Sequence, residues 1–137
     1  MQTIIPYISF NGSCREAMNF YRECLGGELE LIEAGEQLAQ PAPKDSGKLI
    51  FHSSLAKDGV QIMMGSDMMG PYPDASDGRI AMAYNCLDKD EIYSLFDKLL
   101  AGGTALSTVK EESWGLFGML VDRFGIKWML NLNHENN

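Results

Sequence analysis

Apolar residues recur at steps of three and four in two stretches of the chain, which is the spacing of an amphipathic helix. The first stretch lies between Ser13 and Gly26, and the second lies between Asp88 and Gly102. The rest of the chain consists of short alternating segments bounded by turn residues, a pattern typical of β-strands. Strands are predicted at residues 3–10, 28–33, 48–55, 60–65, 79–86, 104–111, 118–122 and 127–132.

The two predicted helices begin and end in the same way. Ser13 and Asp88 each stand three residues before a glutamate, which is the spacing of a capping box. Each helix then meets a pair of glycines, at 26–27 and 102–103, which supply the backbone conformation that ends a helix. Because an extended stretch follows each pair, the chain is predicted to repeat a unit of one strand, one helix and three strands (βαβββ).

Turn signals divide the strands further. Asp58-Gly59 and the segment 123–125 predict tight hairpins at matching places in the two copies. The segments 34–47 and 66–78 contain proline without periodicity and are predicted loops, the second of them linking the copies. The prediction is a single domain over residues 1–137, with a first module at 1–66 and a second at 79–133.

Composition and net charge limit the kinds of molecule that the chain is expected to bind. With 137 residues and a net charge of −8, the chain lacks the basic surface that nucleic acid requires, and an acidic surface also disfavours anionic membranes. No apolar run approaches the roughly 20 residues of a membrane-spanning helix, and the first residues lack a secretion signal, so a cytoplasmic protein is expected. Three cysteines without a CxxC spacing are expected to be reduced.

The duplicated βαβββ unit and three short motifs resemble the vicinal oxygen chelate superfamily, which includes glyoxalase I, extradiol dioxygenases and bleomycin-binding proteins. The motifs are Phe20-Tyr21 and the segments 25–27 and 122–128. The closer likeness is to the PhnB-like branch, often labelled demethylubiquinone methyltransferase-like. The resemblance implies an α+β fold: two βαβββ modules whose curved mixed sheets form a cup-shaped cleft, with helices on the outer faces. It also implies a homodimer.

Many members of that superfamily hold a divalent metal ion with His, Gln or Glu from the first, fourth, fifth and eighth strands. The resemblance places these positions at Pro6, at or near Met63, at Arg79 or Ala83, and at Met129. None of these side chains offers the nitrogen or oxygen ligands that such ions prefer. We therefore expect no metal, and no other cofactor is predicted. A methyltransferase function lacks support, because no glycine-rich nucleotide-binding turn follows a parallel strand.

Strand parity selects the residues that face the predicted cleft. If Met63 and Met129 point inward, polar amides on the same faces do so as well, although ordinary sheet-surface polarity explains those amides equally well. Trp114, which precedes the predicted seventh strand, either forms one side of the cleft or packs over the end of the sheet. Trp128 has the opposite parity and is predicted to lie in the core. The candidate ligand-binding residues are Gln61, Met63, Asn85, Trp114, Met129 and Asn131.

His52 is the histidine inside the predicted fold and is the candidate catalytic residue, as a general acid or base, with a structural imidazole as the alternative. The leading functional hypothesis is metal-independent binding of a small molecule by shape and amide hydrogen bonds. Two other hypotheses stay open. One is a superfamily enzyme (lyase, dioxygenase or transferase) acting on a small oxygenated metabolite, and the other is sequestration of a cationic drug by an acidic cleft.

Overall fold

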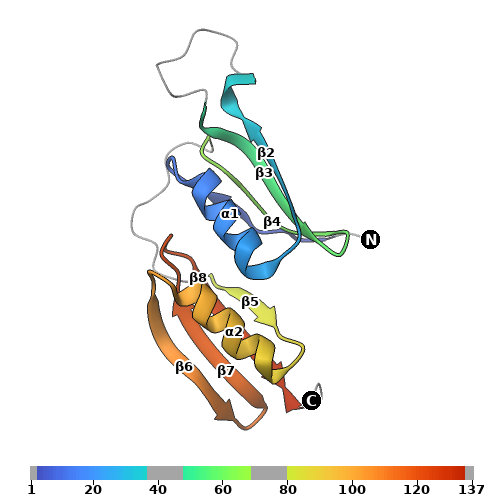
Figure 1. The fold of residues 1–137 in the computed structure, drawn as a ribbon, viewed down its shortest axis with the longest axis vertical. Coiled ribbons are helices and arrows are strands. Elements are labelled where there is room, and N and C mark those ends of the chain that lie inside the picture. The colour runs from blue at the N-terminus through green and yellow to red at the C-terminus, as the bar shows by residue number, and fades with distance from the viewer. Residues whose placement is uncertain (1–2, 37–47, 69–79, 135–137) are drawn as a thin grey trace. The chain divides into compact units, whose positions relative to one another are not determined.

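A strand, a helix and three further strands follow one another twice along the chain (Figure 1). The computed structural model describes residues 3–36, 48–68 and 80–134. The chain divides into two compact units, Met1–Asp74 and Ala75–Asn137. The first unit contains β1 (Tyr7–Ser9), α1 (Cys14–Leu25), β2 (Glu28–Glu33), a short 3-10 helix (Ala34–Glu36), β3 (Ile50–Lys57) and β4 (Val60–Ser66). The second contains β5 (Met82–Asn85), α2 (Lys89–Leu100), β6 (Thr104–Glu112), β7 (Gly115–Val121) and β8 (Lys127–Asn133).

The strands of each unit form one four-stranded mixed sheet, and the two sheets have the same topology. The first sheet has the order β1-β4-β3-β2, and the second has the order β5-β8-β7-β6. In each sheet the first strand is parallel to the last, and the remaining neighbours are antiparallel. This arrangement confirms the α+β fold with two βαβββ modules that the repeated sequence pattern predicted.

Each helix covers one face of the sheet in its own unit (Figure 1). Helix α1 contacts β2, β3 and β4, and α2 contacts β6, β7 and β8. The apolar stripe of each helix is buried, including Met18 and Tyr21 of α1 and Ile92 and Leu99 of α2. Burying such side chains stabilises each unit by about 1.5–3 kcal/mol per large residue. We call the opposite face of each sheet its helix-free face. None of the described helices is long and apolar enough to cross a membrane.

The two helices are capped differently at their N-termini, and only one cap agrees with the sequence prediction. In α2 an Asp88 carboxylate oxygen accepts the Glu91 N–H at 2.8 Å, as predicted, and the Glu91 carboxylate accepts the N–H of Leu87 at 2.6 Å instead of the Asp88 N–H that a capping box uses. In α1 the predicted capping box is wrong: within the described residues the Ser13 side chain makes no capping hydrogen bond. The Asp67 carboxylate caps this helix instead, accepting the N–H groups of Gly12 at 2.8 Å and Cys14 at 3.1 Å.

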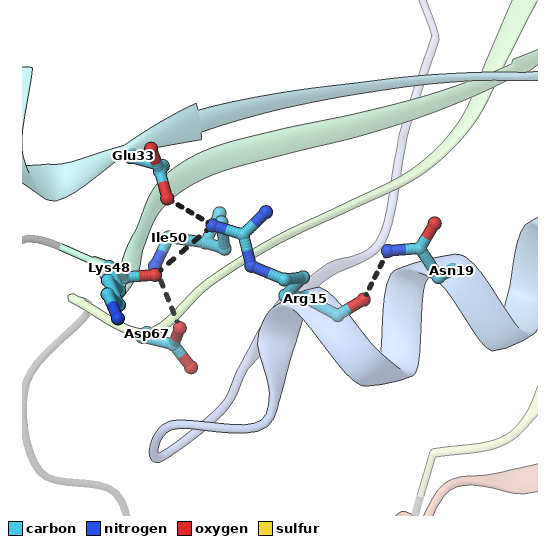
Figure 2. A network of polar contacts seen from close by, with 6 residues as sticks. All are labelled: Arg15, Asn19, Glu33, Lys48, Ile50 and Asp67. Atoms are coloured by element: carbon cyan, nitrogen blue, oxygen red, sulfur yellow. Dashed lines mark hydrogen bonds and ion pairs between the residues drawn. The ribbon is translucent and has the colours of Figure 1, made fainter.

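Asp67 also joins the helix to the sheet. Its second oxygen accepts the Ile50 N–H at 2.9 Å, so one carboxylate holds the start of α1 and the start of β3 together (Figure 2). Beside it the Arg15 guanidinium pairs with Glu33 and donates to the Lys48 carbonyl oxygen at 3.4 Å. This ion pair is solvent-exposed and adds little stability, so the network depends mainly on Asp67.

Gly27 follows the end of the first helix, at a place where the backbone of β3 leaves no room for a side chain. It has φ +100°, and a Cβ atom there would lie 2.3 Å from the Ala56 carbonyl oxygen. We expect Gly27→Ala to lower the free energy of unfolding by about 3 kcal/mol, because the overlap adds to the unfavourable backbone conformation. Gly59→Ala is the control: it has φ +81° with open space around it in the Asp58-Gly59 hairpin turn, so it should cost only about 1 kcal/mol. Equal losses in urea unfolding would contradict this explanation.

Candidate functional site

A β-bulge in the first sheet corrects one of the predicted site residues. Leu55 pairs with Met63 but Ala56 pairs with Gln61, so Ile62 is an extra residue in β4. The bulge places Gln61 and Met63 on opposite faces, although strand parity predicted that they share one. Met63 pairs beside Leu55 on the face covered by α1 and is only 1% exposed. The prediction that Met63 lines the cleft is therefore wrong, and its neighbour Met64 lies on the helix-free face.

Gln61 lies with acidic residues on the helix-free face of the first sheet. Its side-chain amide nitrogen donates to the Ser54 hydroxyl oxygen at 2.9 Å. The two residues border a hollow of about 390 Å³, whose lining also includes Glu28 and Glu30 from β2. Gln61 belongs to the first unit, as do Met63 and His52, whereas Asn85, Trp114, Met129 and Asn131 belong to the second.

His52 lies on the same face and forms a pair with Tyr7. The Tyr7 phenol oxygen is 2.9 Å from Nδ1 of His52, and the two rings are tilted at 35° with centroids 5.7 Å apart. Because β4 separates β1 from β3, the Tyr7 side chain crosses β4 to reach the imidazole. Burial raises the pKa of the Tyr7 phenol, and a hydrogen bond with the Ser66 side chain opposes this shift. The phenol therefore stays protonated at neutral pH.

The helix-free face of the second sheet gathers four of the six predicted ligand-binding residues. Register pairs Ala83 with Met129 and Asn85 with Asn131 along the parallel strands β5 and β8. Together with two aromatic side chains, these residues line an open hollow of about 270 Å³. Its lining is Ala83, Asn85, Trp114, Phe117, Met129 and Asn131.

Hydrogen bonds connect the polar side chains of this hollow. The Trp114 indole N–H donates to the Asn131 side-chain oxygen at 2.8 Å, and the Asn131 amide nitrogen lies 3.4 Å from the Asn85 oxygen and 3.1 Å from the Asn133 oxygen. The Trp114 ring also packs edge-on against Phe117, with centroids 6.0 Å apart. Trp114 remains 47% exposed, so its ring is held in place and is still accessible. Amides and aromatic faces of this kind can orient a small planar ligand.

Phe117 was not among the predicted site residues. The sequence pattern predicted a seventh strand that starts at residue 118, whereas β7 begins at Gly115. Extending the alternation of Met119 two residues backwards would have placed Phe117 on the helix-free face. The prediction for Trp128 is confirmed: it is 1% exposed, and its indole N–H donates to Asp122 at 2.9 Å.

The positions at which the resemblance to the superfamily places metal ligands carry unsuitable side chains in this chain. The Phe10 N–H donates to the Ser66 carbonyl at 2.9 Å, and the Cys86 N–H donates to the Asn131 carbonyl at 2.7 Å, which aligns the two sheets residue by residue. With this alignment, the central helix-free positions of the parallel strand pairs are Tyr7, Met64, Ala83 and Met129.

These side chains offer two thioethers, a methyl group and a hydrogen-bonded phenol. Hard and borderline divalent ions instead prefer imidazole nitrogen and carboxylate oxygen. Across residues 3–36, 48–68 and 80–134, no three His, Cys, Asp or Glu side chains cluster in a way that suits a metal ion. Arg79, one of the two positions considered for the fifth strand, lies outside the described residues. The residues present therefore do not fit the metal of the superfamily.

Cys14 is a buried thiol with low expected reactivity. Burial raises its pKa to about 11, although the Ser53 hydroxyl at 3.4 Å opposes the shift. Because the folded pKa is raised, the associated stability is complete below the ordinary value of 9.0 and is lost as the pH rises toward 11. At pH 7 we expect iodoacetamide to alkylate the partly exposed Cys24 before Cys14, as read by peptide mass spectrometry. Faster labelling of Cys14 in the folded chain would contradict this assignment.

Several known proteins are similar to this chain in sequence or in structure. A sequence profile of the 3-demethylubiquinone-9 3-methyltransferase family matches residues 2–131. Protein YjdN of Escherichia coli (strain K12) is 31% identical over 138 residues, covering 93% of this chain and 92% of YjdN. The crystal structure of protein PA1353 from Pseudomonas aeruginosa is similar with a TM-score of 0.82 and 35% identity, covering 97% of this chain and 98% of PA1353.

A more distant structure has the same fold. TnmS3, an antibiotic binding protein from Streptomyces sp. CB03234, is similar with a TM-score of 0.54 and 22% identity. The match covers 96% of this chain and 97% of TnmS3.

Proposed function

The chain belongs to the 3-demethylubiquinone-9 3-methyltransferase family, and on this premise we propose that it binds a small molecule without a metal ion. The binding site is the hollow on the helix-free face of the second sheet. The observation that carries the proposal is the connected set of Trp114, Asn131 and Asn85 side chains beside the apolar Met129 and Phe117.

The dimensions and chemistry of the hollow support this function. Its volume of about 270 Å³ lies near the lower end of the ~300–1,000 Å³ typical of ligand pockets, so it suits a compact ligand of one or two rings. Asn85 and Asn131 each carry a donor and an acceptor, which suits a neutral ligand with both kinds of group. TnmS3 is an antibiotic binding protein, so this fold is used elsewhere to bind a small molecule. The homodimer and the cytoplasmic location stay predictions from the sequence.

Binding can be tested with four small probes in the presence of EDTA: benzamide, nicotinamide, indole and p-cresol. We expect at least one of them to raise the melting temperature of the chain, and to do so equally with and without the chelator. Asn131→Ala should weaken that binding about tenfold, because it removes a ligand hydrogen bond and the partner of Trp114.

The matched control is Gln61→Ala, which removes an amide from the first sheet and should leave the affinity unchanged. Two results would overturn the proposal. One is binding that disappears when EDTA is added, and the other is binding that Gln61→Ala weakens more than Asn131→Ala. Elemental analysis of protein purified without chelator should likewise find less than one equivalent of zinc, nickel, manganese or iron per chain.

A further inference from the structure

The two units repeat the same sheet topology, so the residues on the two helix-free faces can be compared position by position. Aligned through their matching backbone hydrogen bonds, Met64 corresponds to Met129 and Ser66 corresponds to Asn131. The antiparallel neighbours extend the alignment, because Ser54 pairs with Met64 as Met119 pairs with Met129. Ser54 of β3 therefore corresponds to Met119 of β7, and two residues earlier in the same strands His52 corresponds to Phe117.

The largest difference between the two faces is at the first strand of each unit. Tyr7 pairs with Met64, and Ala83 pairs with Met129. On the first sheet the Tyr7 side chain crosses the central strand and its hydroxyl reaches His52 at 2.9 Å. On the second sheet a methyl group stands in the same place, and the region beside it is the hollow. At this position the first sheet has the phenol group of Tyr7, whereas the second sheet has Ala83 and a hollow that is large enough for a phenol ring.

We propose that the second sheet binds a phenol-type aromatic ring, which occupies beside Ala83 the place that the Tyr7 side chain takes on the first sheet. This inference rests on the proposed function and names the ligand class of the same site. The ring would pack against Met129, Trp114 and Phe117.

The polar residues of the hollow match such a ring. The Tyr7 hydroxyl on the first sheet is close to Ser66, and the corresponding residue on the second sheet is Asn131, whose side chain is linked to Asn85 and Trp114. An amide can both donate to a phenol oxygen and accept its proton. The six residues lining the hollow include no basic side chain, so the ring binds as a neutral phenol.

The inference also assigns a role to the Tyr7–His52 pair. The two rings cover the corresponding part of the first sheet, so that sheet takes no such ring, and the part of the chain that the structure describes holds one site of this kind. Truncating the tyrosine should open a second one, because His52, Met64 and Ser66 would remain as its lining.

The probe is p-cresol, which has the same ring and hydroxyl as the tyrosine side chain, and toluene is the matched compound without the hydroxyl. Binding is followed by the side-chain N–H signals of Trp114 and Asn131 in two-dimensional NMR spectra. We expect p-cresol to bind about five- to tenfold more tightly than toluene, as one added hydrogen bond predicts. Ala83→Tyr should abolish p-cresol binding, and Tyr7→Ala should raise the stoichiometry from one to two.

Ala105→Tyr is the control, because it adds a tyrosine to an exposed position of β6 in the same sheet. It should bind p-cresol like the unmodified chain. The inference is overturned if Ala83→Tyr binds p-cresol normally, or if p-cresol and toluene bind equally while benzamide, nicotinamide or indole shifts the Trp114 signal. In that second case the proposed function stands. If none of the four probes shifts the Trp114 and Asn131 signals, the proposed function fails and the inference fails with it.

Discussion

Asp122→Ala is expected to lower the free energy of unfolding by about 3–5 kcal/mol. The Asp122 carboxylate is 3% exposed and closes the turn between β7 and β8. One of its oxygens accepts the N–H groups of Phe124 at 2.8 Å and Ile126 at 3.0 Å, and the other accepts the Trp128 indole N–H at 2.9 Å. The substitution removes the acceptor of three N–H groups, and one of these is the indole N–H of a fully buried ring. The loss is measured by urea unfolding followed by circular dichroism.

A double-mutant cycle separates the indole bond from the turn. Trp128→Phe removes the indole N–H together with part of the ring, so it has its own packing cost. In the double variant the stranded donor no longer exists, and the combined loss should fall short of the sum by about 1–2 kcal/mol. Strict additivity would mean that the bond between Asp122 and Trp128 contributes nothing.

Asp67→Ala is expected to lower the free energy of unfolding by about 3 kcal/mol. The carboxylate accepts backbone N–H groups from Gly12, Cys14 and Ile50, and its negative charge also stabilises the N-terminus of α1. The substitution therefore releases the start of the helix from the start of β3. Urea unfolding measures the loss.

Substitutions at the two cap positions provide the controls. Ser13→Ala should be almost neutral, because Ser13 makes no side-chain capping bond in the described residues. Asp88→Ala removes a true cap and should cost about 1 kcal/mol. If Ser13→Ala costs as much as Asp88→Ala while Asp67→Ala is neutral, the assignment of Asp67 as the cap of α1 is wrong.

Local spacing was sufficient to predict most of the fold. The helical periodicity, the Asp88 cap and the turn at Asp58-Gly59, where both residues have positive φ, depend on residues that are neighbours in sequence. Asp67 could not be predicted in this way. It lies more than fifty residues after the start of the helix that it caps, and the serine in the local capping position gave a plausible but wrong alternative.

The same dependence on local spacing explains why strand parity assigned some candidate site residues to the correct face and others to the wrong one. On the second sheet Asn85, Met129 and Asn131 share one face, as strand parity predicted, because the pairing of β5 with β8 is regular. On the first sheet the bulge at Ile62 reverses the alternation, so Met63 became a core residue. A prediction from strand parity assumes an uninterrupted strand, and a single extra residue moves every residue beyond it to the opposite face. The pairing of Tyr7 with His52 depends on a long-range register that the sequence pattern does not contain.

The most direct test of metal-free binding at the second sheet uses the two tryptophans as reporters. Trp114 borders the hollow, whereas Trp128 is buried beneath the opposite face. In EDTA, titration with benzamide, nicotinamide, indole or p-cresol should shift the indole signal of Trp114 and the side-chain amide signals of Asn131 and Asn85 while leaving that of Trp128 in place. Unchanged Trp114 and Asn131 signals with all four compounds, or shifts that appear only when a divalent metal ion is supplied, would contradict metal-free binding at this sheet.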